Sequence, residues 1–196
     1  MKKGKLLWIV AIVVALGLFR WCKNTYNGMV SADEGVQSAW SQVENVYQRR
    51  ADLIPNLVAT VKGYAEHESG TLEAVVAARA KATQTTVDPS QLTAENIAKF
   101  QAAQGELGSA LGRLLVTVER YPDLKANQNF LELQAQLEGT ENRISTERMK
   151  FNETAKSYNT LIRSFPQNIL ASIFSFTPKG YFKAAEGSEN APKVEF

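Results

Sequence analysis

The chain has 196 residues, 44% of them apolar, which suffices for one core of ordinary size and an added membrane segment. Its 22 basic and 20 acidic residues nearly balance, which excludes the strongly positive surface typical of nucleic-acid-binding proteins, so we expect no nucleic-acid partner. One cysteine and one histidine exclude an intrachain disulfide and argue against a protein-built metal site.

Residues 6–19 form a run of fourteen uncharged, mostly apolar residues with basic residues on both sides. Such a run predicts a membrane segment, although this length of helix covers only about 21 Å of a hydrocarbon core roughly 30 Å thick. A cleaved signal peptide is the alternative, but bulky or charged residues follow the run where small residues would mark a cleavage site. We therefore predict an uncleaved anchor over residues 1–25, spanning about 6–22, with Trp21 and Tyr26 as candidate membrane-interface residues.

The basic residues beside the run predict its orientation. Lys2, Lys3 and Lys5 precede it, whereas Arg20 and Lys23 follow it. Because positive charge is retained on the cytoplasmic side, we expect the amino terminus in the cytoplasm and the folded part on the outer side of the membrane. The margin is three basic residues against two.

The first long helix of the folded part is predicted over about residues 31–66. Ser31 and Glu34 have the spacing of a capping box, and Pro55 is expected to kink the helix without ending it. Alternating steps of four and three residues select one stripe, which is apolar or aromatic except for one arginine. The stripe consists of Val36, Trp40, Val43, Tyr47, Arg50, Ile54, Leu57, Val61 and Tyr64.

Two further helices are predicted over about residues 71–83 and 94–119, separated by a polar loop. The second of them repeats the spacing of the first long helix. Its stripe consists of Ile97, Phe100, Gln104, Leu107, Leu111, Leu114 and Val118. Gly105, Gly108 and Gly112 lower the helix propensity of this segment and permit close approach to a neighbour.

The fourth and longest helix is predicted over about residues 123–165, ending where Pro166 disfavours helical backbone in the residue before it. Its stripe consists of Phe130, Leu133, Leu137, Thr140, Ile144, Glu147, Phe151, Thr154, Tyr158, Leu161 and Phe165. Four helices with this spacing predict an all-α fold. We expect an antiparallel, up-and-down, left-handed four-helix bundle over residues 26–165, with one N-terminal transmembrane helix.

Residues 166–185 form an apolar segment that is too short to span a membrane. It either covers the open end of the bundle or lies in the bilayer interface. For the second arrangement, Ile173, Phe174 and Phe176 are the candidate membrane-interface residues. Residues 186–196 are predicted to be a disordered tail.

Several short motifs stand out along the chain: Tyr26-Asn27, the run from Gln48 to Val58, the run from Tyr121 to Asn127, Tyr158-Asn159 and Phe165-Pro166. Together these motifs resemble those of the LemA family. The resemblance implies a single-span protein of the bacterial inner (cytoplasmic) membrane whose folded part is an antiparallel four-helix bundle. It implies no established enzymatic activity.

Charged residues on the apolar stripes are the candidate functional residues. An unpaired buried charge costs several kcal/mol, so these side chains should find partners. The candidate buried polar layer consists of Arg50, Asp52, Asn56, Arg79, Glu141, Glu147, Arg148 and Asn152. In one interpretation the layer fixes the register of the helices, and in the other it lines a ligand or partner site inside the bundle.

No hydrolase or nucleotide-binding motif and no glutamate-x-x-histidine pair accompanies these residues in the sequence. We therefore expect no catalytic residues, no cofactor and no enzyme. The sequence favours a membrane-anchored protein-protein interaction or scaffold module whose partner is another envelope protein. The alternative is a sensor-like, ligand-binding bundle that uses the polar layer around Arg50 and Glu147.

Overall fold

The computed structural model describes residues 2–184, so the tail predicted over residues 186–196 lies outside the described part of the chain. All elements of the described part are helical, which confirms the all-α class. In chain order they are α1 (Lys2–Lys62), η1 (Glu66–Glu68), α2 (Ser69–Gln84), η2 (Pro89–Gln91), α3 (Ala94–Val118), α4 (Pro122–Lys125), α5 (Gln128–Arg163) and α6 (Gln167–Ile173).

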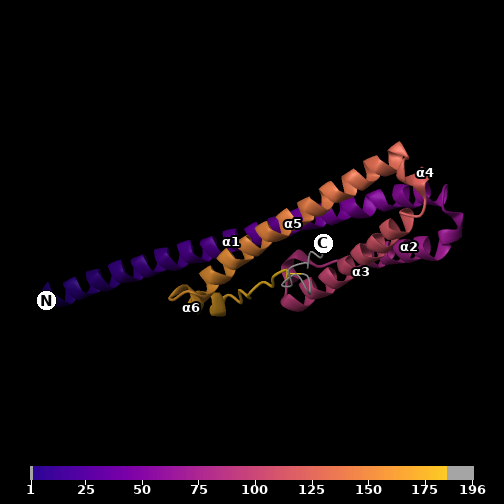
Figure 1. Cartoon of the computed structure of the whole chain (residues 1–196). Helices are drawn as coiled ribbons and strands as arrows, with labels where there is room; N and C mark the ends of the chain where they lie inside the picture. The colour runs from indigo at the N-terminus through magenta and orange to yellow at the C-terminus, as the bar shows by residue number, and fades with distance from the viewer. Residues whose placement is uncertain (1, 185–196) are drawn as a thin grey trace, which may run out of the picture.

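α1 is one continuous helix of 61 residues, about 90 Å long, that contains both the apolar run and the first long helix of the folded part (Figure 1). By length and composition it can cross a membrane, and its most apolar window is not buried by the rest of the chain. The helix start predicted at Ser31 is wrong, because Ser31 lies inside α1. Gly28 and Gly35 lower the local helix propensity, but single glycines do not end a helix. Pro55 also lies within α1.

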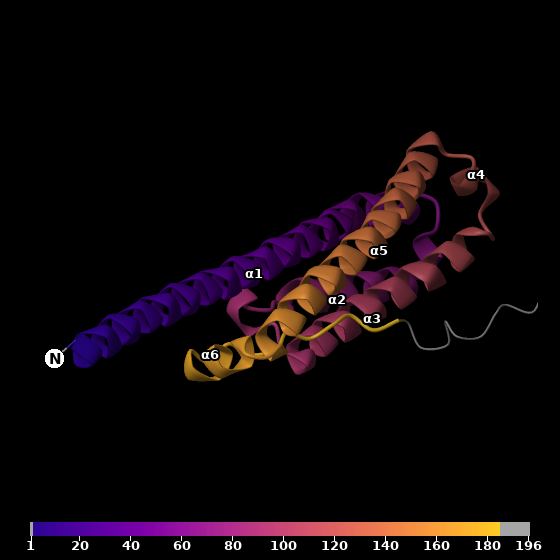
Figure 2. The same ribbon diagram turned by 90° about the vertical axis from the view of Figure 1, so that its left-hand side faces the viewer.

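The helices of residues 26–184, here called the helical body, pack in pairs. α1 packs along α5, and α2 packs along α3, while α1 also contacts α2. α6 folds against α5 and α1. Within the described residues α3 and α5 share no extended contact, and in the view of Figure 2 the two helices diverge toward α4. One face of the body therefore has two neighbouring helices that are not packed together.

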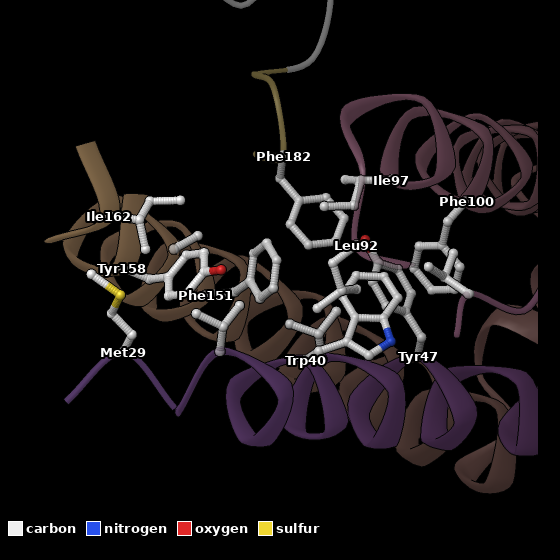
Figure 3. Close-up of a cluster of buried hydrophobic side chains, with 14 of the residues drawn as sticks. Met29, Trp40, Tyr47, Leu92, Ile97, Phe100, Phe151, Tyr158, Ile162 and Phe182 are labelled. Atoms are coloured by element: carbon white, nitrogen blue, oxygen red, sulfur yellow. The ribbon is translucent and has the colours of Figure 1, made fainter. Parts of the chain in front are cut away.

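Two clusters of buried apolar side chains fill the helical body. The proximal cluster, nearer the apolar run, includes Trp40, Phe151 and Phe182 (Figure 3). The distal cluster includes Leu114 and draws on α1, α2, α3, α4 and α5. The stripe of α1 supplies both clusters, and eight of its nine residues are buried. The exception is Tyr64, which is 45% exposed because α1 ends before it.

The fourth predicted helix is divided in the structure. Pro122–Lys125 forms the short α4, and α5 starts only at Gln128. Asn127 separates them, because its backbone is extended and its Oδ1 accepts a hydrogen bond from the Phe130 nitrogen at 3.0 Å, which caps α5. The continuous helix predicted from residue 123 is therefore wrong at its start. Phe165 lies beyond the end of α5 and is 81% exposed, although the stripe placed it in the core.

Candidate functional site

Residues 177–184 form an extended segment, here called the strap, that follows α6 and runs between α5 and the start of α3 (Figure 2). Its Phe182 is buried in the proximal cluster and stacks on Trp40 with the ring centroids 5.8 Å apart. Phe182 also meets Phe151 and Phe100 edge to face, with centroid distances of 5.5 and 6.5 Å (Figure 3). The strap therefore completes the proximal core.

Two asparagines of α5 hold the strap by its backbone. Asn152 Nδ2 donates to the Phe182 carbonyl at 2.9 Å, and the Phe182 N–H donates to Asn152 Oδ1 at 2.9 Å. The same two-way pairing joins Asn159 to Lys179, with both distances 2.8 Å. Because the asparagines are seven positions apart, close to two helical turns, both lie on one face of α5. These pairs satisfy backbone groups and so recognise an extended chain rather than particular side chains.

The region around the start of α3 holds the other side of the strap. Gln101 makes a two-way pair with the Lys183 backbone at 2.9 and 3.1 Å, and the Gly180 N–H donates to the Leu92 carbonyl at 2.8 Å. A Cβ on Gly180 would lie 2.6 Å from Ala94 Cα and 2.7 Å from its nitrogen. Only glycine therefore allows the strap to lie this close to the backbone of α3.

A buried ion pair joins the strap to α1. Lys179 Nζ lies 2.7 Å from Asp33 Oδ1, and the Lys179 side chain is only 6% exposed. The same ammonium lies 5.5 Å from the ring centroid of Tyr158, whose hydroxyl donates to the Thr177 carbonyl at 3.1 Å. Burial, with the negative charge of Asp33 as a further cause, raises the pKa of Tyr158 to about 12. Tyr158 therefore stays protonated and keeps donating this hydrogen bond at neutral pH.

A polar layer around Arg50 crosses the body between the two core clusters. The Arg50 side chain is 5% exposed, and its Nη2 donates to Gln104 Oε1 at 2.7 Å and to the Gln104 carbonyl at 3.1 Å. Its Nη1 donates to Glu141 Oε2 at 3.1 Å. Arg79 Nε donates to the Ala51 carbonyl at 2.7 Å. Arg50 thus connects α1 to α3 and α5, and Arg79 connects α2 to α1.

Glu147, the other charge on a predicted apolar stripe, lies away from this layer. Its Oε1 is 2.7 Å from Lys150 Nζ. Within residues 2–184 no hydrogen bond or ion pair joins Glu147 to Arg50. The reason is helical geometry, because Glu141 and Glu147 are six positions apart and their side chains therefore point toward different faces of α5.

Four further predicted members of the polar layer also lie elsewhere. Asp52 and Asn56 are exposed on α1. Asn152 holds the strap, and Arg148 Nη2 donates to the Lys183 carbonyl at 2.6 Å. The sequence pointed to the last two residues without indicating the strap that they bind.

We expect Arg50→Met to lower the free energy of unfolding by about 1.5–3 kcal/mol, because both Gln104 acceptors lose a buried charged donor. The helix content should be retained. Denaturant unfolding of the full chain in detergent, followed by circular dichroism, measures the change. Arg50→Met combined with Gln104→Leu should recover part of the loss, since the orphaned side-chain acceptor is then absent. An Arg50→Met protein as stable as the parent would contradict this role.

An open groove lies between α3 and α5 beyond the strap. Its distal part encloses about 460 Å³ and is lined by Arg50, Gly108, Leu111, Gly112, Leu115, Gln134, Leu137, Glu138 and Glu141. A second part of about 680 Å³ shares Arg50, Gly108 and Glu141 with the first and extends to Ala184, at the end of the strap. Because the two parts share lining residues, they form one groove, and the end of the strap lines the part nearer the proximal cluster.

Three glycines of α3 line this groove. Gly105, Gly108 and Gly112 are exposed, and a Cβ on any of them would have no heavy atom of the described chain within 4 Å, apart from its own helix and neighbours. The close neighbour that these glycines suggested is therefore not another helix of the described chain. At these three positions the α3 wall of the groove carries no side chain, while Leu111 and Leu115 line it between and beyond them.

The predicted membrane-interface residues gather at the proximal end of the body. The ring centroids of Phe174 and Phe176 lie 4.8 and 5.8 Å from that of Tyr26. Trp21 packs, partly buried, against the proximal cluster. Ile173 ends α6 and is 66% exposed. The C-terminal segment thus meets α1 just beyond its apolar run.

The arrangement of side chains in the groove and around the strap is suited to binding polypeptide. Side-chain amides and arginines supply hydrogen bonds to an extended backbone, and leucines supply apolar wall. Within residues 2–184 no group of three or more histidine, cysteine, aspartate or glutamate side chains is placed to hold a metal ion.

These features define an all-helical protein with a candidate N-terminal membrane helix and a groove that holds an extended chain. The sequence model of the LemA family matches residues 39–196, and the chain belongs to this family. The resemblance seen in the motifs is thereby confirmed.

The chain is also similar in sequence to three named bacterial proteins. Magnetosome protein MamQ 2 of Paramagnetospirillum magneticum is 27% identical over 194 residues, which cover 90% of this chain and 71% of that protein. MamQ of Magnetospirillum gryphiswaldense is 29% identical over 174 residues, covering 80% and 64%. Protein LemA of Metamycoplasma hominis is 24% identical over 183 residues, covering 93% and 80%. Together with the apolar helix, these likenesses indicate a membrane-associated bacterial protein, and none of the three names states a reaction.

Proposed function

We propose that this protein is a membrane-anchored interaction module whose groove between α3 and α5 binds an extended segment of another envelope protein. The observation that carries the proposal is the strap, because it is an extended polypeptide bound in the proximal end of that groove through its backbone. The open part of the groove continues the same path. A second polypeptide segment can therefore bind in the way that the strap does.

The dimensions and lining of the open groove suit this occupant. From Arg148 to Gln134, α5 rises about 21 Å, which accommodates about six extended residues. Leu111, Leu115 and Leu137 offer apolar contacts, while the groove also presents amide and carboxylate groups. Backbone-directed binding tolerates varied partner sequences, as a scaffold requires.

The proposal includes a placement for the whole chain. α1 spans the inner membrane of the bacterium once, with the amino terminus in the cytoplasm and the helical body on the outer side, as the excess of basic residues before the apolar run favours. The four long helices form an antiparallel bundle left open between α3 and α5. A ligand site using both Arg50 and Glu147 is not part of the proposal, because Glu147 pairs with Lys150 instead.

Photo-crosslinking in intact cells tests the function. A benzoylphenylalanine at Gln134, in the groove, should crosslink to one extended segment of another protein, identified by mass spectrometry. The same residue at Val76, which is 51% exposed on α2, is the control and should not give this product. Gly108→Trp, which fills the groove, should abolish the crosslink from position 134, and Val76→Trp should not.

Two outcomes would contradict the proposal. Crosslinks from positions 134 and 76 to the same proteins, or a crosslink unaffected by Gly108→Trp, would show that the groove is not the binding surface. A crosslink from position 134 only to residues 185–196 of the same chain would show that the chain fills its own groove.

A further inference from the structure

Four large apolar side chains are exposed around α6. Phe165, Ile169, Ile173 and Phe174 are 81, 51, 66 and 51% exposed. This group, here called the α6 surface, belongs to ten consecutive residues of the chain. Apolar side chains this concentrated on the surface of a folded protein usually meet a partner or a membrane.

The position of the α6 surface along α1 is fixed by direct contact. The Phe174 ring lies 4.8 Å from that of Tyr26, and α6 packs against α1. Because α1 is one continuous helix, Tyr26 lies about 10 Å beyond Phe19, the last residue of the apolar run. The α6 surface is thus held close to the end of the membrane segment.

The length of the apolar run places the bilayer boundary at this level. Residues 6–19 cover about 21 Å, and roughly 9 Å of a 30 Å hydrocarbon core remain. Measured from Leu6, about six further residues of α1 cover this remainder, which brings the boundary close to Tyr26, beyond the end at about residue 22 that the sequence predicted. Those six residues include Arg20 and Lys23, so α1 alone offers little apolar surface there.

We propose that the α6 surface inserts into the boundary between headgroups and acyl chains and forms a second membrane contact beside α1. Lipid is the partner that covers this surface. The surface adjoins the membrane segment and lies beside the part of α1 just after Phe19, which has few apolar side chains. Phenylalanine and isoleucine side chains supply the apolar face that such an interfacial contact buries. The contact would fix how the helical body tilts relative to the bilayer, whatever binds in the groove.

Depth measurements on the full chain in liposomes of phosphatidylethanolamine and phosphatidylglycerol test the proposal. In a Cys22→Ser background, nitroxide labels are placed singly at Ile173→Cys and Ile169→Cys. Val13→Cys, in the apolar run, is the control for insertion of α1. Val116→Cys, which is 73% exposed on α3, is the control for an apolar position far from the bilayer.

The accessibility ratio is the collision rate of the label with dissolved oxygen divided by its collision rate with a water-soluble nickel chelate. We expect this ratio to be several-fold higher at positions 173 and 169 than at position 116. Equal accessibility ratios at 173, 169 and 116, with position 13 deeply buried, would overturn the proposal while leaving the anchor intact. Spin-spin broadening at 173 that persists in detergent would show that a second copy of the chain covers the surface, and would also overturn it. Circular dichroism checks that each labelled variant is folded.

Discussion

Gly180→Ala is expected to release the strap and to lower the free energy of unfolding by about 3–5 kcal/mol. The new Cβ would lie 2.6 Å from Ala94 Cα, and a backbone atom at the start of α3 cannot yield as a flexible side chain does. Phe182 would then leave the proximal core, and removal of a buried phenylalanine costs about 3–5 kcal/mol. Denaturant unfolding of the full chain in detergent measures this loss.

Hydrogen exchange provides a second measurement of the same prediction. The amides of Lys179, Phe182 and Lys183 donate to side-chain oxygens of α5 and α3, so their exchange should accelerate in Gly180→Ala. Gly105→Ala is the control, because a Cβ there has open space and alanine favours a helix. If Gly180→Ala lost less than about 1 kcal/mol and kept these amides protected, the close approach of the strap would not matter for stability.

Trp40→Ala is expected to be similarly damaging, with a loss of about 3–5 kcal/mol. The Trp40 side chain is fully buried and contacts three other aromatic rings, those of Phe100, Phe151 and Phe182. Its removal leaves a cavity. The three surrounding rings belong to α3, α5 and the strap, and they cannot all move inward to fill it. Thermal or denaturant unfolding in detergent measures the loss.

Trp40→Phe separates the ring contacts from the indole N–H. The Trp40 indole nitrogen lies near Glu44 but makes no hydrogen bond of ordinary geometry among the described residues. Losing this N–H should therefore cost little. The loss of stability in Trp40→Phe should be less than half of the loss in Trp40→Ala. Val116→Ala, at an exposed position, should change stability by less than about 0.5 kcal/mol. A Trp40→Ala variant no less stable than Trp40→Phe would contradict the central role of this ring.

The regular spacing of apolar residues predicted the long helices and most of their buried faces. The stripe on α1 from Val36 to Val61 is buried throughout, because a repeated three-four spacing leaves one helical face for the core. Arg50, its single charged member, is paired with Glu141, which was among the candidate residues. The spacing of apolar residues therefore identified the buried helix faces, because both follow from the regular turn of the helix.

The strap could not be predicted in the same way. Its binding depends on Asn152 and Asn159 contacting backbone groups 20 to 30 residues away, and backbone groups leave no pattern in the sequence. The requirement for glycine at position 180 comes from its contact with the start of α3, which the local sequence does not indicate. Asn127 divides the predicted fourth helix near its start, because an asparagine cap competes with helix continuation. Contacts between distant segments, rather than local propensity, decided these features.

α1 continues without interruption from the apolar run into the helical body, so these two parts of the chain keep a fixed rotational relationship. Each residue of an α-helix advances the side chains by about 100°. Inserting one residue between Cys22 and Tyr26 would thus rotate the helical body by that angle against the anchor. Inserting seven would bring the two back nearly into phase while raising the body by about 10 Å. The direction in which the groove faces is therefore set, residue by residue, by the length of α1.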